Sequence, residues 1–437
     1  MSLSGKIAWN TLIQMIGKFS STIVGIIIVA ILTRYLTKFD YGTFTFITVF
    51  VTMFGAIADW GLTLITVREA SKNAPYAGEI IGNTVLVRLI LAIGGSLAAA
   101  IAIRFINPDP QIQILVTLAS LWLIALSLKT SFQIIFNVKL KMQNWAISEV
   151  VANLVVLTLL LLIVQTHGGL QQIILAYLAA NFVAAGVAAG LAIRMQQFKF
   201  SLFTPKTKYL LTEALPMGSL LVLFTVYNRL DTVILSFVGG QVPVATYGVA
   251  YRIFEVLILG AAYFSNSILP IISNLAVTDK KKMGLVYQKS FLILAWLGII
   301  VALGNFFLAP SMVRVVAGAN YADSVVPLRI LSLALIVSYF NHLNGYTLIA
   351  LHKQWSSFGI ALAALAVNLV LNVLFIPHYS YVAAAVNTFI TEALIVVCSL
   401  WVIKKETGVL PRFTGMFTII GDLITYRGKI FNIKNES

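Results

Sequence analysis

Long apolar runs, separated by short polar segments, form the pattern of hydrophobic and polar positions along this chain. A helix that crosses a bilayer needs about 20 mostly apolar residues. The runs are too long for the strands of a membrane barrel, and they lack the period-two alternation of such strands. The pattern therefore predicts an all-α polytopic membrane protein with about 12 transmembrane helices, at residues 7–32, 42–66, 83–103, 109–128, 147–165, 170–193, 209–238, 243–275, 290–309, 326–350, 355–376 and 380–403.

The composition of the 437-residue chain indicates the same class, because 59% of its residues are hydrophobic and 10% are charged. A soluble globular domain has about 45–50% apolar and about 25% charged residues. The single cysteine, Cys398, cannot form an internal disulfide, and no Cys/His spacing typical of a metal site is present. No nucleotide-binding loop, zincin motif or nucleophile–base pair occurs either. We therefore expect no cofactor, no metal ion and no enzymatic activity.

The basic residues orient the predicted helices. The chain has 30 Lys and Arg against 15 Asp and Glu, a net charge of +15. If the N-terminus is cytoplasmic, 21 basic residues fall in cytoplasmic segments, Lys129 among them, and 4 fall outside. This bias predicts that both termini are cytoplasmic. It also accounts for most of the net charge, so we expect no nucleic-acid partner. We expect no cleavable signal peptide, because Lys18 interrupts the long first apolar run and no small-residue cleavage pattern follows it.

Twelve spans divide into two halves joined by a basic segment. We expect a six-helix bundle at residues 1–200, a second at 201–403 and a basic cytoplasmic tail at 404–437. The tail either lies on anionic lipid or is weakly ordered. Tyr41-Gly42 and Tyr247-Gly248 occupy matching positions 206 residues apart, which indicates two parallel repeats related by an axis along the membrane normal.

Four charged residues fall inside the seventh and eighth predicted spans, Arg229 and Asp231 on one and Arg252 and Glu255 on the other. An ionisable group at membrane depth costs several kcal/mol and usually faces a cavity or a partner. Helical rise places the four groups at similar depths, with Tyr251 beside them. One interpretation is a cavity wall that binds an anionic headgroup, because the planar Arg fork suits phosphate. The other is a structural pairing between the Arg and carboxylate side chains.

Further charges fall in the first three predicted spans. Lys18 lies about 17 Å into the first span, where a cavity position is expected. Asp59 in the second span is either a proton-coupling carboxylate or a cap beside Trp60-Gly61. Arg88, early in the third span, is expected to anchor the helix at the interface.

Two carboxylates and a set of amides complete the polar residues of the spans. Glu149 lies near a span end and is expected to be solvated or to cap the helix. Glu392 lies deeper, and the sequence offers it no partner. The amides and the histidine of the tenth and eleventh spans are expected to join helices to one another; they are Asn341, His342, Asn344, Asn368 and Asn372.

Three stretches resemble the polysaccharide flippases, the O-antigen and capsule repeat-unit branch of the multidrug/oligosaccharidyl-lipid/polysaccharide exporter superfamily. Residues 28–46 are similar to the family's turn motif at Arg34, Leu36, Tyr41 and Gly42. Residues 58–72 resemble its Asp-x-Gly-Leu…Arg-Glu motif, and residues 366–392 its Asn-rich span, Ile-Pro turn and Ala-rich span. Ser380-Tyr381 departs from the glycines usual in the family at that turn.

The resemblance implies a V-shaped fold of two bundles around a central cavity in the bacterial cytoplasmic (inner) membrane. It implies alternating access that moves an undecaprenyl-diphosphate-linked oligosaccharide from the cytoplasmic to the outer leaflet. Because the sequence has no nucleotide-binding motif, we expect either an ion gradient, of protons or sodium, or the substrate gradient to drive export. Membrane lipid and the polysaccharide polymerase machinery are the candidate partners. The expected headgroup-binding residues are Lys18, Arg229, Tyr251 and Arg252, and the expected ion-coupling or pairing carboxylates are Asp59, Asp231 and Glu255.

Other membrane proteins fit the sequence less well. A multidrug/cation antiporter of the same superfamily is the nearest alternative, but it would favour an acidic or aromatic cavity. A peptidoglycan-precursor flippase usually has two further spans, and a major-facilitator transporter has a loop motif that is missing here. A polysaccharide polymerase or ligase typically needs a long periplasmic loop, and every predicted loop here is short.

Overall fold

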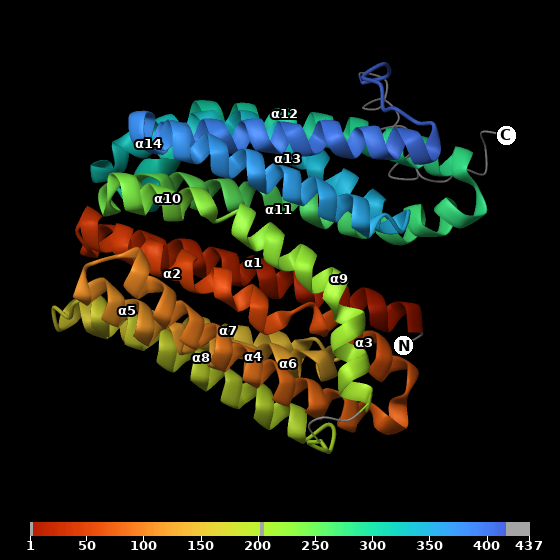
Figure 1. Ribbon diagram of the computed structural model, residues 1–437, viewed down its shortest axis with the longest axis horizontal. Helices are drawn as coiled ribbons and strands as arrows, with labels where there is room; N and C mark the ends of the chain where they lie inside the picture. Colours follow the sequence, from red (N-terminus) through yellow and green to blue (C-terminus); the bar gives the residue numbers. More distant parts are fainter. Residues whose placement is uncertain (1–2, 202–204, 417–437) are drawn as a thin grey trace. The chain divides into compact units, whose positions relative to one another are not determined.

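The computed structural model describes residues 3–201 and 205–416, without the side chains of residues 3–16, 18 and 74. All regular secondary structure in these ranges is helical (Figure 1). The helices divide into two compact units, which are Met1–Ala245 with Val316–Gly318, and Thr246–Val315 with Ala319–Ser437. The predicted division after residue 200 stays a prediction; in the structure, residues 205–245 group with the first unit.

The first unit consists of ten helices, a short 3-10 helix and the start of an eleventh helix in the described ranges. Asp109 begins α5 by accepting a hydrogen bond from the Gln111 amide (2.8 Å), with Pro110 in the first turn. The elements are α1 (Leu3–Tyr35), α2 (Lys38–Asp59), α3 (Leu62–Lys72), η1 (Ala74–Tyr76), α4 (Ala77–Ile106), α5 (Pro110–Ser120), α6 (Trp122–Val138), α7 (Gln143–Gln165), α8 (Leu170–Ile193), α9 (Pro205–Tyr227) and α10 (Leu230–Gly239).

The second unit is built from long helices, of which α11 and α12 contribute their ends to the first unit. Its last helix contains a sharp turn, because Ser380 has φ 51° and ψ −134°, three residues after Pro377. This turn separates the last two predicted spans. The elements are α11 (Gln241–Thr278), α12 (Lys280–Ala317), η2 (Ala319–Ser324), α13 (Val325–Ala350) and α14 (Gln354–Thr407).

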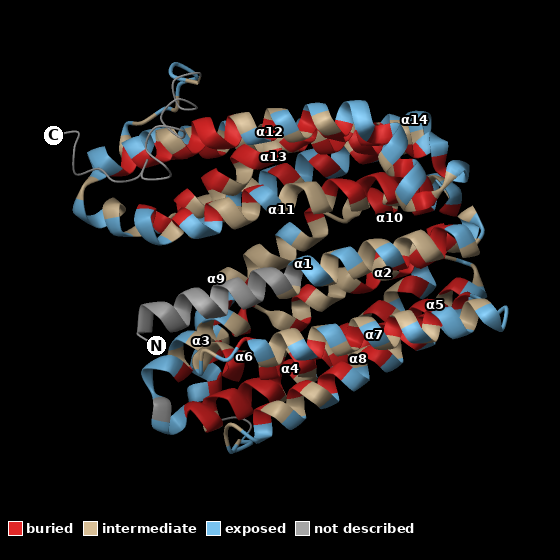
Figure 2. Cartoon of the chain, turned by 180° about the vertical axis from the view of Figure 1, so that it is seen from behind, coloured by how far each residue is buried: buried red, intermediate tan, exposed pale blue. Residues whose placement is uncertain are grey.

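The described helices confirm an all-α polytopic membrane protein. Ten of them are long and apolar enough to cross a membrane, and one of these, α14, holds two predicted spans. The described part of the first predicted span forms a shorter apolar helix, Phe19–Tyr35. Every predicted span falls in a helix, while the exact count and the orientation of the termini stay predictions. Exposed apolar side chains such as Leu97 and Ile101 of α4 suit contact with lipid. Figure 2 shows buried and exposed stretches alternating along the helices.

Two candidate membrane spans of the first unit are broken. Between α2 and α3, Trp60 (φ 45°) and Gly61 (φ 69°) both adopt the left-handed conformation. Between α9 and α10, Arg229 leaves helical geometry with φ −122° and ψ −12°. Breaks in membrane helices free backbone groups and commonly occur where transporters hold ligands or ions. Each break carries predicted site residues, Asp59 at the first and Arg229 with Asp231 at the second.

Candidate functional site

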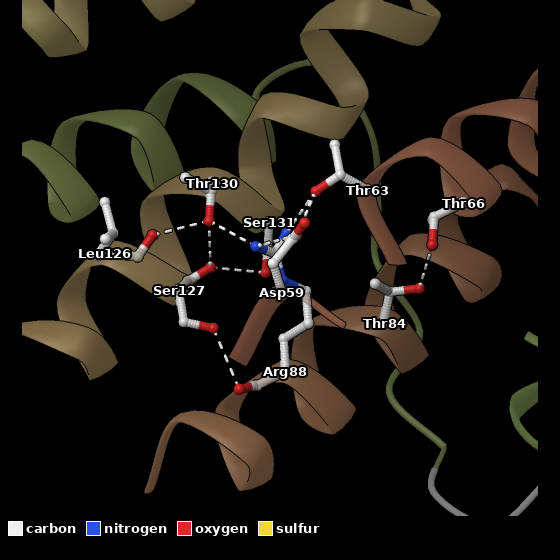
Figure 3. Close-up of polar contacts among 9 residues, drawn as sticks. All are labelled: Asp59, Thr63, Thr66, Thr84, Arg88, Leu126, Ser127, Thr130 and Ser131. Carbon is white, nitrogen blue, oxygen red and sulfur yellow. Dashed lines mark hydrogen bonds and ion pairs between the residues drawn. The ribbon is translucent and has the colours of Figure 1, made fainter. Parts of the chain in front are cut away.

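The clearest polar site in the described part of the first unit is an ion pair between Asp59 and Arg88 (Figure 3). Asp59 ends α2, and Arg88 lies on α4, eleven residues after Ala77, or roughly 17 Å along the helix. An Arg88 Nη2–Asp59 Oδ1 distance of 2.8 Å joins them. The Arg88 side chain is 3% exposed, whereas the Asp59 side chain is 28% exposed. The expected interfacial role of Arg88 is wrong, because this cation is buried within the bundle.

Hydroxyl groups of α3 and α6 complete the surroundings of this pair. Thr63 donates to Asp59 Oδ1 (2.7 Å) and accepts from Arg88 Nη1 (3.1 Å). Thr130 accepts from Arg88 Nη2 (2.8 Å), and Ser127 donates to the Arg88 carbonyl (3.1 Å). Of the Arg88 guanidinium, the Nε atom is left buried with no hydrogen-bond partner. A buried charge is tolerated when it is paired and hydrogen-bonded in this way.

A second ion pair joins α6 to α7. Lys129 Nζ lies 2.8 Å from Glu149 Oε1, with side chains 6% and 26% exposed, and 5.2 Å from the centre of the Trp145 ring. Lys129 was expected in a cytoplasmic loop, and this expectation is wrong, because α6 continues to Val138 and buries Lys129 inside the unit. Glu149 was expected to be solvated or to cap the helix; it is partly exposed and pairs with Lys129.

The two pairs lie at one level of α6, because Lys129 is adjacent in sequence to Thr130, the partner of Arg88. We call Asp59, Arg88, Lys129 and Glu149 the charged layer. In both pairs the cation is almost fully buried and the carboxylate is partly exposed. A carboxylate that stays accessible while its cation is fixed can take up a proton or a metal cation and so loosen its pair.

At the break between α9 and α10, Asp231 is 3% exposed and lies in the first turn of α10. Its Oδ1 accepts a hydrogen bond from the Thr232 amide (2.7 Å). A carboxylate at this end of a helix is stabilised by the free backbone N–H groups. Arg229 occupies the residue immediately before the helix.

In the second unit, Arg252 and Glu255 form an ion pair on α11. Their Nη1–Oε2 distance is 3.3 Å, and the side chains are 42% and 28% exposed. The Arg252 Nε atom is buried without a hydrogen-bond partner. Tyr251 is 9% exposed and lies between Tyr247 and Phe254, at 5.5 Å between ring centres on each side.

The predicted four-charge cluster is divided by the two units, since Arg229 and Asp231 belong to the first and Arg252 and Glu255 to the second. The cluster therefore stays a prediction. The side chain of Lys18 lies outside the described residues.

Amides and hydroxyls connect the helices of the second unit. Asn372 donates to Asn368 (2.8 Å), and Asn387 donates to Asn372 (2.9 Å), so these buried amides join the two arms of α14. The carboxylate of Glu392 accepts hydrogen bonds from Ser338 (2.9 Å) and Asn341 (2.6 Å) of α13. The sequence offered Glu392 no partner because these groups lie more than 50 residues away.

Comparison with known proteins identifies relatives for this arrangement. A structure of the lipid II flippase MurJ in an inward closed conformation has 16% sequence identity and a TM-score of 0.74, over 97% of this chain and 92% of that chain. An inward-facing multidrug resistance MATE family transporter of the MOP superfamily has 14% identity and a TM-score of 0.72, over 89% and 95%. At such identities the likeness establishes a common fold.

Sequence comparison gives a narrower relationship. The "Probable flippase AglR" of Haloferax volcanii is 28% identical over 190 residues, which are 42% of this chain and 40% of that protein. The matched region thus spans about two fifths of this relative. The model of the family described as "Polysaccharide biosynthesis protein" matches residues 7–276, which is more than half of the chain. The chain belongs to this polysaccharide biosynthesis protein family.

Proposed function

We propose that this protein is a flippase for a lipid-linked oligosaccharide. Its substrate is an undecaprenyl-diphosphate-linked repeat unit, which moves from the cytoplasmic to the outer leaflet of the cytoplasmic membrane by alternating access. Family membership, a relative named as a probable flippase and the fold of a lipid II flippase support this proposal.

The observation that carries the proposal is the state of Arg252. This guanidinium lies on a candidate membrane span, eleven residues or roughly 17 Å after the start of α11. Its ion pair with Glu255 is long (3.3 Å), its side chain is 42% exposed and its Nε atom lacks a hydrogen-bond partner. An Arg with spare donors at membrane depth suits the phosphate groups of a lipid-linked sugar.

The headgroup is held by Lys18, Arg229, Tyr251 and Arg252. Asp231 and Glu255 balance these cations when the substrate is absent. Asp59 couples transport to a proton or sodium gradient, because it stays partly exposed beside the buried Arg88. Uptake of a cation by Asp59 weakens its attraction to Arg88 and lets α2 and α4 move.

Export in a strain that lacks its own repeat-unit flippase tests this proposal. Arg252→Ala or Arg229→Ala should reduce surface polysaccharide at least tenfold, a loss worth about 1.4 kcal/mol. Arg329→Ala is the matched control, because Arg329 is exposed and contacts Phe306 of its own unit. Normal export by both variants at normal protein levels would refute the anionic-headgroup site.

An ion-coupled multidrug antiporter is the second candidate function. The partly exposed carboxylates Asp59 and Glu149 favour it, since they could receive organic cations. Proteoliposomes distinguish the two functions. A flippase translocates a fluorescent undecaprenyl-diphosphate disaccharide, whereas an antiporter expels ethidium when a proton gradient is applied.

A further inference from the structure

The candidate span formed by α2 and α3 makes two close glycine contacts, one with the first residue of α11 and one with α9. Near the start of α2, a Cβ atom on Gly42 would lie 1.8 Å from the backbone oxygen of Gln241, the first residue of α11. This distance is far below any real Cβ contact, and the opposing atom is backbone. The two chains can approach this closely only because residue 42 is glycine.

The second contact lies at the break after α2. A Cβ atom on Gly61 would lie 2.9 Å from the Gly218 nitrogen, and one on Gly218 would lie 2.7 Å from the Trp60 oxygen. Gly61 also has a left-handed φ of 69°, which glycine adopts at no steric cost. Here both partners must be glycine for the backbones of α2 and α9 to pack.

The spacing of the two contacts matches the thickness of a membrane. Gly42 and Gly61 are 19 positions apart on the span Lys38–Lys72. At a rise of 1.5 Å per residue, this separation is roughly 30 Å, the thickness of the hydrocarbon core. Their partners Gly218, on α9, and Gln241, the first residue of α11, are 23 positions apart in the sequence. With the predicted orientation, Gly42–Gln241 is the outer contact and Gly61–Gly218 is the inner contact.

Different chemistry reinforces the two contacts. At the end of α1, eight residues before Gly42, the Arg34 guanidinium donates to the Val316 carbonyl (3.2 Å). Seven residues after Gly61, Arg68 pairs with Glu213 (2.9 Å), which lies five residues before Gly218; the side chains are 43% and 42% exposed. At the outer end, the glycine contact is accompanied by a hydrogen bond from a guanidinium to a backbone carbonyl. At the inner end, the glycine contact is accompanied by an exposed ion pair.

We propose that the outer and inner contacts are the two gates of transport, and that Gly42, Gly61 and Gly218 are positioning residues for gate closure. This inference rests on the proposed function, because alternating access requires each side to open in turn. Opening to one side separates one glycine contact while the other holds. A single methyl group at one contact therefore biases the protein toward opening on that side alone.

Pulsed electron paramagnetic resonance on the full chain in nanodiscs tests the gates without any substrate. Spin labels at Phe39 and Val242 report the outer end, and labels at Leu64 and Leu215 report the inner end, with the native cysteine replaced by serine. All four positions are exposed, between 44% and 57%. Gly42→Ala should lengthen the outer distance and leave the inner distance unchanged, and Gly218→Ala should do the reverse.

Gly94→Ala is the matched control, because a Cβ atom at Gly94 meets no atom within 4 Å, and it should change neither distance. If an alanine variant fails to fold, Arg68→Gln combined with Glu213→Gln replaces it, and only the inner distance should lengthen. Unchanged distances in the glycine variants, or equal changes at both ends, would contradict the proposal that the two glycine contacts are gates. If the distances stay unchanged but polysaccharide export is normal, the gate proposal fails and the flippase function stands. If the distances change selectively but no polysaccharide is exported, the flippase function fails and the gate proposal stands.

Discussion

The two units bury different kinds of polar contact. In the first unit, the charged layer sets Arg88 against Asp59 and Lys129 against Glu149, with both cations almost fully buried. In the second unit, buried contacts between described helices are mostly made by neutral groups, such as the amides of Asn368, Asn372 and Asn387. Helices can therefore be joined inside this membrane protein either with charge or without it.

The difference bears on which unit can respond to ions. An amide neither gains nor loses a proton and binds a metal cation weakly, so an amide contact stays the same when a gradient changes. A carboxylate next to a fixed cation can be neutralised by a proton or matched by sodium. Charge is expensive at membrane depth, and the first unit retains two pairs that join different helices, each with a buried cation and an accessible carboxylate. The Arg252–Glu255 pair of the second unit lies within one helix, and its cation is 42% exposed. Under the proposed coupling to a proton or sodium gradient, the two accessible carboxylates place ion sensing in the first unit.

The largest expected effect follows from removing the partner of Arg88. Asp59→Ala leaves a buried guanidinium without its counter-charge, which should cost about 3 kcal/mol of unfolding free energy, the low end for a broken buried pair. The low end applies because Asp59 is 28% exposed. Unfolding in mixed SDS micelles measures the loss. Asp59→Ala with Arg88→Met removes both charges and should recover most of the stability; no recovery would show that Asp59 acts through contacts other than the ion pair.

A smaller loss is expected at the second pair. Glu149→Ala deprives Lys129 of its carboxylate but leaves the Trp145 ring 5.2 Å away as a partial replacement. The same unfolding measurement should show a loss of about 2 kcal/mol. Additional substitution of Trp145 by Leu should increase the loss. If Glu149→Ala is as harmful as Asp59→Ala, the ring does not stabilise the lysine.

Hydropathy was enough to place every predicted span in a helix, because membrane-crossing helices must be long and apolar. It failed at Lys129, where the charge was taken as the end of a span although the apolar stretch Ile134–Phe136 continues the helix. The sequence singled out Asp59 but not Thr63, although the two residues are only four positions apart and their side chains are hydrogen-bonded.

The partners of Arg88 could not be predicted from the sequence, whereas the pairing of Arg252 with Glu255, three residues away, was one of its two interpretations. Arg88 meets Asp59 and Thr130 only because α2, α4 and α6 pack together, and these residues are 29 and 42 positions away from it. A single sequence contains no record of such packing. The glycine contacts could not be predicted for the same reason, although the Tyr41-Gly42 motif itself is visible in the sequence.

In the second unit, Asn372→Ala removes the two hydrogen bonds that Asn372 makes with Asn368 and Asn387. It leaves no buried charge without a partner. Hydrogen bonds between membrane helices are worth about 0.6 kcal/mol on average, so the expected loss of unfolding free energy is about 1 kcal/mol. The loss should be the same at pH 5 and pH 8, because only neutral groups take part. A strong pH dependence would reveal a coupled ionisable group and weaken the contrast between the units.

The smallest effect is expected at Lys353 and Glu406, an ion pair of 2.8 Å at the ends of α14, with side chains 36% and 28% exposed. Exposed pairs contribute about 0–1 kcal/mol, since water screens the charges and the side chains lose freedom. Lys353→Ala should therefore change the unfolding free energy by less than about 0.5 kcal/mol, and added salt should erase the difference. A short distance alone would then be a poor guide to stability in this protein. The buried position of Arg88 and Lys129, rather than the 2.8 Å that all three pairs have in common, would set the cost of breaking a pair.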